Sequence, residues 1–173
     1  MNTTTTTQLP TGTWTLDPTA TTVTVFAKKL GLFTIPATLT VVSGSIEIGD
    51  DHQVTNVEVI ADASSYASKN AKRNEHVTSP DFLDAEAHPT VAFRAGDVTP
   101  SGAGHASTGT VTVKGQTTPM NVAVSNVDVD GATGSFVATA TVDRNAIGVD
   151  KMPALIIGRN LEIIVNATAR KNP

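Results

Sequence analysis

The side chains that could take part in acid–base chemistry are concentrated between Arg73 and Phe93. The histidines and carboxylates of this stretch are His76, His88, Glu75, Asp81, Asp84 and Glu86. A histidine oriented by a carboxylate could act as a general base. We favour a structural role, in which Arg73 pairs with Asp81 or Asp84, because structural ion pairs produce the same clustering of charge. No serine has the Gly-x-Ser-x-Gly spacing of a nucleophile elbow, so we predict no catalytic residues and no enzyme activity.

The same histidines are poor candidates for a metal site. His76 and His88 are too far apart to lie on one helical turn, and His52 and His105 lie in turn-like segments rich in Gly and Asp. The chain contains no cysteine, so a thiolate-ligated metal and a disulfide framework are both excluded. No spacing of three or four converging ligands is present, and we predict no metal.

Length and charge limit the other function classes. The 173 residues carry a formal net charge of −4 and no basic stripe, which argues against nucleic acid as a partner. We expect a disordered Thr-rich leader over residues 1–12 and one domain over residues 13–170. No secretory signal or apolar membrane span is apparent, so we expect a cytoplasmic protein without stable membrane insertion.

Most of the chain alternates apolar and polar residues with a period of two. Such segments start near Val23, Val57, Val91, Val111, Met120, Phe136 and Leu161, and Gly, Asn, Asp and Pro separate them. This pattern is typical of half-buried β-strands. About eight short strands predict an all-β fold, either an antiparallel barrel or a sandwich.

The stretch from Ser68 to Glu86 does not alternate and is expected to form one or two short helices between two strands. Ser79 followed by Pro80 and Asp81 has the pattern of a helix start, with Ser79 as the N-cap. Pro89 would then prevent the helix from continuing.

The expected inward positions are mainly Val, Ala and Ile, and the chain has only five Phe, one Trp and one Tyr. A barrel of about eight strands can be filled by side chains or can hold one small ligand. Composition leaves both possibilities open. Arg144 shares the inward face of its strand, where a guanidinium needs partners; it could pair with Asp81 or Asp84 or meet a ligand head group.

Four segments, taken in order, resemble the successive signatures of the YceI-like, polyisoprenoid-binding family. They are residues 30–48, 65–93, 109–120 and 142–149, and the resemblance extends from Trp14 to Ala169. It implies a lipocalin-like antiparallel barrel, closed at one side by helices, with an apolar tunnel for isoprenoid or other amphiphilic lipids.

The chain departs from the family pattern at several of these positions. The family's Arg-Asp-x-His-Leu corresponds to Arg73, Asn74, His76 and Val77, and its Ser-x-Asp-Phe-Phe-Asp to Ser79, Asp81, Phe82, Leu83 and Asp84. Lys29 replaces a histidine, and Leu39 and Val42 replace aromatic residues. Most of these changes exchange large groups for smaller ones.

The resemblance and the inward pattern together define the expected site. The expected ligand-binding residues are Val23, Val25, Ala27, Leu39, Val59, Phe82, Phe93, Val113, Phe136, Ala138, Ile163 and Val165. The expected polar latch consists of Arg73, His76, Asp81, Asp84 and Arg144, and residues 152–158 form either a lid or an outer loop.

The function that this site implies is binding, storage or transport of an isoprenoid-like or other amphiphilic lipid. A bound isoprenoid or quinone-like lipid is expected in place of a cofactor. The alternatives are an enzyme acting on a lipophilic small molecule in the same cavity and a packed, partner-binding barrel. The sequence is also compatible with a homodimer.

Overall fold

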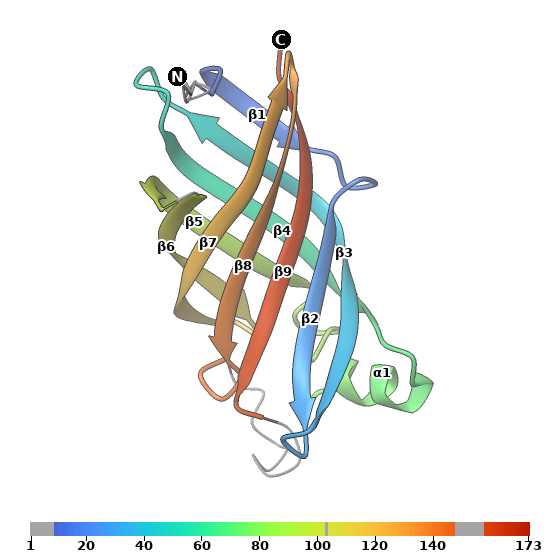
Figure 1. The fold of residues 1–173 in the computed structure, drawn as a ribbon. Coiled ribbons are helices and arrows are strands. Elements are labelled where there is room, and N and C mark those ends of the chain that lie inside the picture. Colours follow the sequence, from blue (N-terminus) through green and yellow to red (C-terminus); the bar gives the residue numbers. More distant parts are fainter. Residues whose placement is uncertain (1–8, 103, 148–157) are drawn as a thin grey trace.

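The structure, a computed structural model, describes residues 9–102, 104–147 and 158–173. These residues form nine β-strands and one α-helix (Figure 1). The elements are β1 (Gly12–Leu16), β2 (Thr22–Lys29), β3 (Phe33–Ile48), β4 (Val54–Ala67), α1 (Ala71–Thr78), β5 (Thr90–Ser101), β6 (Gly104–Val113), β7 (Gln116–Asp130), β8 (Thr133–Asp143) and β9 (Asn160–Lys171).

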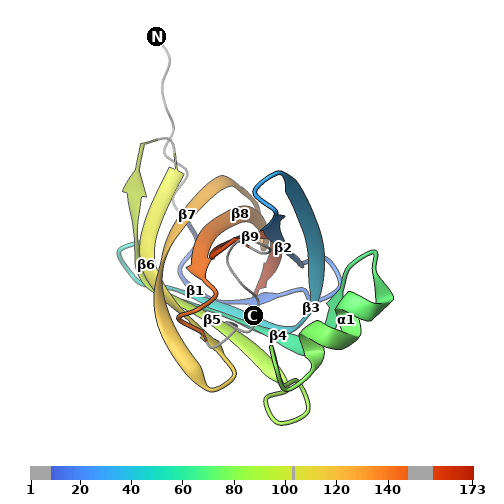
Figure 2. The same ribbon diagram turned by 90° about the horizontal axis from the view of Figure 1, so that it is seen from below.

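The strands form one antiparallel sheet that closes on itself, as the view along the barrel in Figure 2 shows. Closure results from β3, which pairs with β2 on one side and with β4 on the other. Both β1 and β2 pair with β3 and β9, β1 near one end of these long strands and β2 near the other. The two therefore share one position, and the nine strands make an eight-strand barrel, which confirms the lipocalin-like all-β fold.

Tight hairpins connect several neighbouring strands, and local sequence explains their geometry. Between β6 and β7 the turn consists of Lys114 and Gly115, because Val113 pairs directly with Gln116. Both turn residues have positive φ angles, 55° and 74°. A two-residue hairpin turn of this kind requires positive φ at both positions, which glycine adopts without a steric cost.

Alternation along the strands places the predicted inward residues inside the barrel. Val23, Val59, Phe93, Val113, Ile163 and Val165 are buried, and Val25, Phe136 and Ala138 are partly buried against the same core. Val23 and Ala61 are completely buried, both 0% exposed. The period-two pattern therefore identified the interior face of these strands.

The connection between β4 and β5 contains one helix, but the predicted helix start is wrong. Asn70 caps α1, and its side chain accepts a hydrogen bond from the Arg73 N–H. Ser79 lies at the other end of α1, with extended backbone (φ −70°, ψ 167°). A residue before proline is biased toward extended conformations, so Pro80 helps to end the preceding helix instead of starting a new one.

The predicted leader includes residues that the structure places on the barrel. Leu9 packs against the hydrophobic core, and its carbonyl lies 2.8 Å from Nδ1 of His52. Pro10 accepts a hydrogen bond from Nε1 of Trp14. Contacts with the barrel therefore begin before residue 12, the expected end of the leader. Residues 1–8 and most of the predicted lid over 152–158 lie outside the described residues.

Candidate functional site

A cavity of about 170 Å³ lies inside the barrel at the end that carries α1. Most of its lining is apolar and comes from residues that alternate inward along the strands. The lining residues are Val25, Ala27, Ile35, Leu39, Tyr66, Arg73, His76, Val77, Phe82, Leu83, Val91, Phe93, Val111, Val113, Val142, Arg144, Ile147, Leu161 and Ile163.

The helix and the turns after it form part of the wall of this cavity. Phe82 is buried, and its ring meets the His76 ring edge to face, with 4.6 Å between the centroids. The Leu83 N–H donates to the Val77 carbonyl at 2.9 Å, which ties the turns to α1. From the β6–β7 hairpin, Lys114 donates to the Pro80 carbonyl at 2.9 Å. This part of the wall is therefore hydrogen-bonded to itself and to the rim of the barrel.

The polar side chains of the lining are Tyr66, Arg73, His76 and Arg144. Burial raises the pKa of the Tyr66 phenol above its usual value, and the positive charge of Arg73 only partly offsets the increase. Tyr66 therefore stays protonated at neutral pH and can donate a hydrogen bond. His76 is exposed and lies on α1, so it presents its ring at the edge of the cavity.

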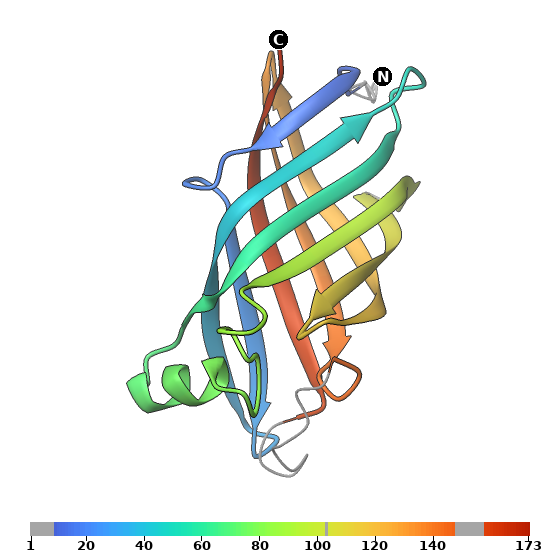
Figure 3. The same cartoon turned by 180° about the vertical axis from the view of Figure 1, so that it is seen from behind.

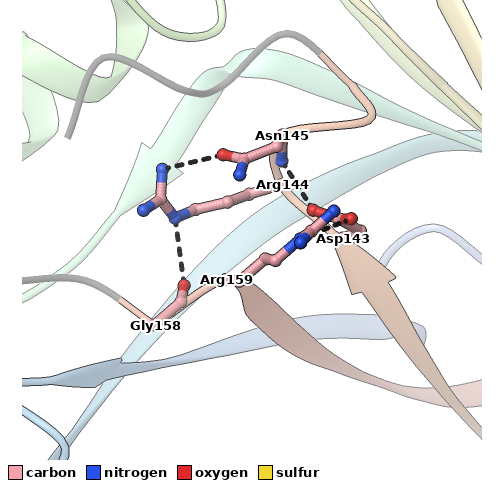
Figure 4. A network of polar contacts seen from close by, with 5 residues as sticks. All are labelled: Asp143, Arg144, Asn145, Gly158 and Arg159. Atoms are coloured by element: carbon pink, nitrogen blue, oxygen red, sulfur yellow. Dashed lines mark hydrogen bonds and ion pairs between the residues drawn. The ribbon is translucent and has the colours of Figure 1, made fainter. Parts of the chain in front are cut away.

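Arg144 contributes a buried guanidinium to the cavity wall, with only 2% of the residue exposed. Its Nε donates to the Gly158 carbonyl at 3.0 Å, and Nη1 lies 3.4 Å from Oδ1 of Asn145 (Figure 4). The neighbouring Asp143 pairs instead with Arg159 at 2.8 Å, nearer the surface. Hydrogen bonds to the chain thus hold the Arg144 guanidinium in a mostly apolar cavity wall.

The expected latch is corrected by this geometry. Within the described part of the chain, neither Asp81 nor Asp84 forms an ion pair with Arg73 or Arg144. Because Ser79 ends α1, Asp81 falls in an exposed turn and not in the first turn of a helix. The described residues also contain no group of three or more potential metal-ligating side chains.

The predicted ligand-binding residues divide into three groups. Seven line the cavity beside α1: Val25, Ala27, Leu39, Phe82, Phe93, Val113 and Ile163. Four belong to the core or pack against it, and they line neither this cavity nor a smaller one described below: Val23, Val59, Ala138 and Val165. Phe136 lines a different cavity. The prediction missed four further lining residues, Val91, Val111, Val142 and Leu161. Each lies on the inward face of a strand that was already identified, so the two-residue alternation alone could have found them.

The different cavity lies at the opposite end of the barrel, which Figure 3 shows as the end with β1 and the C-terminus. Its volume is about 80 Å³. Its lining residues are Leu9, Trp14, Ile46, Ile48, Val54, Val57, Val98, His105, Val124, Val127, Val129, Gly134, Ser135, Phe136 and Ala169. No charged carboxylate, Lys or Arg side chain is among them.

A closed eight-strand barrel with a mostly apolar cavity under a short helix defines a lipocalin-like class of protein. Residues 14–169 match the model of the YceI-like domain, and the chain belongs to the YceI-like family. Relatives include a UPF0312 protein of Vibrio cholerae, 28% identical over 106 residues, which are 58% of this chain and 56% of that protein. Another, from Vibrio parahaemolyticus, is 30% identical over 95 residues, 51% of this chain and 50% of that protein. The chain thus matches about half the length of these curated relatives.

Solved structures with the same fold include Burkholderia cenocepacia BcnA, with a TM-score of 0.77 and 19% identity over 88% of this chain and 98% of that chain. A polyisoprenoid-binding domain from Saccharophagus degradans has a TM-score of 0.71 and 10% identity, covering 92% of this chain and 98% of that chain. At these identities the similarity establishes the fold. Among the described residues, no helix has the length and apolar character needed to cross a membrane.

Proposed function

We propose that this protein binds and carries an amphiphilic, isoprenoid-like lipid in the cavity beside α1. The observation that supports this most is the composition of the wall: among the described residues it is apolar along most of the strands and polar at Tyr66, Arg73, His76 and Arg144. Such a wall suits an apolar chain with one polar end. The polyisoprenoid-binding domain of Saccharophagus degradans, which has the same fold, supports the same ligand class.

The orientation of the ligand follows from the distribution of these groups. An apolar chain would lie along Val113 and Ile163, with its polar end toward Arg144 and His76. A hydroxyl, phosphate or carbonyl group there could accept hydrogen bonds from the guanidinium or from the Tyr66 phenol.

The volume limits how much of a lipid this cavity holds. An apolar cavity of roughly 150 Å³ stays dry and binds a benzene-sized guest. The cavity of about 170 Å³ is comparable, so it accommodates a group near the size of one isoprene unit. A longer chain would need repacking of neighbouring side chains or would extend out of the mouth. Its affinity comes from removing apolar surface from water, at about 25 cal/mol per Å² before ordering costs.

Mass spectrometry of organic extracts from the purified protein tests this proposal. The parent should yield a co-purified isoprenoid-like lipid, whereas Val113→Phe should yield none, because the larger ring occupies the cavity. Val129→Phe is the matched control at the far cavity and should retain the lipid. Loss of lipid from both variants, or its absence from the parent, would argue against the proposed site.

The enzyme alternative gives a different result in the same preparation. A carrier releases its lipid unchanged after prolonged incubation, whereas an enzyme converts it to a product that His76→Ala no longer forms. A carrier role covers both storage and transport, which differ in whether labelled lipid moves from donor to acceptor vesicles. The cytoplasmic location stays a prediction, and cell fractionation would test it.

A further inference from the structure

The tip of the β2–β3 hairpin carries an exposed apolar cluster. Among the described residues, five large hydrophobic side chains are exposed, and three of them belong to this tip: Leu30 at 53%, Leu32 at 80% and Phe33 at 59%. Single exposed apolar residues are common on protein surfaces, but a contiguous group marks a site of interaction. The cluster is also at the same end of the barrel as α1 (Figures 1 and 3).

The register of the hairpin connects this tip to the cavity. Ala27 pairs with Ile35, and both residues line the cavity. The next pair on the same face is Lys29 with Phe33, because side chains on one face of a strand recur at every second residue. Phe33 thus continues the inner wall of the hairpin beyond the cavity, and the turn with Leu30 and Leu32 follows it.

Two lysines accompany the apolar tip and indicate the chemistry of its partner. Lys28 is exposed and donates to the Thr34 hydroxyl at 2.7 Å, while Lys29 is half-buried on the inner face. Lysine stems can pack along apolar groups while their ammonium groups reach outward to anions. The chain as a whole has a net charge of −4, so any attraction to an anionic surface must be local, within a Debye length of about 10 Å.

We propose that the hairpin tip, consisting of Lys28, Lys29, Leu30, Leu32 and Phe33, docks on the surface of a membrane that contains anionic phospholipid. The three apolar side chains would enter the interfacial region, and the two ammonium groups would contact phosphate groups. Peripheral membrane-binding elements commonly combine leucine and phenylalanine with lysine, as this tip does. A second copy of the chain fits less well, because both tips would bring the same two positive charges together.

This docking does not depend on what the cavity holds, but it brings the end of the barrel that contains the cavity next to a membrane. The inner face of the hairpin would then form a mostly apolar path from the membrane surface, past Phe33, to Ile35 and the cavity. A lipid could move along it with less exposure of its chain to water.

Co-sedimentation of the full chain with vesicles tests the proposal. One set of vesicles contains phosphatidylcholine and phosphatidylglycerol, and the other contains phosphatidylcholine alone. The double variant Leu32→Ser/Phe33→Ser should reduce the partition coefficient on the anionic vesicles by about tenfold or more, because it removes two apolar side chains from the contact. Val42→Ser is the control, because Val42 is also an exposed apolar residue (54%, against 59% for Phe33) and lies on β3 away from the tip.

The lysines provide an independent measurement. Lys28→Gln/Lys29→Gln should remove most of the preference for anionic over neutral vesicles and most of the dependence on salt. Thermal melts should show that all variants stay folded, since the apolar tip residues are exposed. The proposal fails if the parent does not bind vesicles, or if the tip variant binds as the parent does. It also fails if the tip variant changes only the molecular mass of the protein without vesicles, since the tip would then be a contact between copies of the chain.

Discussion

The two ends of the barrel are built from similar strands but differ in how they are filled. The end beside α1 has the larger cavity, about 170 Å³ against about 80 Å³. Its lining includes Tyr66, His76 and the two guanidinium groups of Arg73 and Arg144, whereas the far cavity is lined by no Lys, Arg, Asp or Glu among the described residues. At the far end, Trp14 and Leu9 line the cavity and pack with the core, and the backbone carbonyls of residues 9 and 10 lie within hydrogen-bond distance of the His52 and Trp14 side chains. Val23 and Ala61, which line neither cavity, are completely buried.

This difference indicates that one end provides stability and the other provides room. An eight-strand barrel is just wide enough for side chains to fill, so a cavity persists only where the inward residues are too small to meet. Ala27, Val113 and Ile163 leave that space beside α1. We therefore expect substitutions at the far end and mid-barrel to change folding stability, and substitutions beside α1 to change ligand binding.

The largest expected effect is at Trp14, which is 3% exposed. Trp14→Ala should lower the free energy of unfolding by about 3–5 kcal/mol, because removing the largest side chain of the core leaves a large void. Phe82→Ala should cost less, since Phe82 is smaller and borders the cavity of about 170 Å³, whereas Trp14 borders the one of about 80 Å³. Urea denaturation of both variants measures the difference. A larger loss for Phe82→Ala would mean that the α1 end carries the greater share of the stability.

A pair of alanines sharpens the same comparison. Ala61→Leu should destabilise the protein by about 1–3 kcal/mol, because Ala61 is fully buried and lines neither cavity. Ala27→Leu should leave stability nearly unchanged, because the added atoms enter the cavity. It should also weaken lipid retention. Equal destabilisation by the two variants would indicate that the space beside Ala27 closes in solution.

Sequence patterns predicted the barrel and its inner face but not how the interior is divided. Val23 and Val25 share one face of β2, yet Val25 lines the cavity and Val23 is in the packed core. Alternation specifies the direction of a side chain, whereas a cavity depends on the sizes of residues on several strands that meet in space.

The prediction for the helical connection between β4 and β5 was wrong for a more local reason. Ser79 before Pro80 is compatible with a helix start and with the end of a preceding helix, and only the second occurs. This error placed Asp81 in the first turn of a helix, whereas Asp81 lies in an exposed turn. Arg144, which brings a buried charge to the cavity wall, was assigned inward from the two-residue alternation of its strand alone.

Arg144 provides a smaller test of the polar end. Arg144→Met removes the donor to the Gly158 carbonyl and should cost about 1–3 kcal/mol of stability. It should also lower affinity for lipids with a polar head group more than for hydrocarbons of the same length. Arg159→Met is the control, because that exposed ion pair with Asp143 should contribute about 0–1 kcal/mol. If the two lipid classes lose affinity equally, the guanidinium does not contact the head group.

The smallest expected effect concerns alkaline pH. Since the pKa of Tyr66 is raised in the folded protein, its contribution to stability is complete below the unfolded value of about 10 and is lost as pH rises through the folded value. The parent should therefore lose more stability than Tyr66→Phe over this range. Urea denaturation across alkaline pH measures both slopes, and since the chain has one tyrosine, parallel slopes would contradict the assignment.

The central claim is that the cavity beside α1, and not the far cavity, holds the lipid. A crystal structure determined with farnesol, an isoprenoid alcohol, tests it most directly. Our account predicts farnesol density among Phe82, Val113 and Ile163, with the hydroxyl toward Arg144 or His76. Density beside Trp14 with an empty cavity at the α1 end would contradict the account.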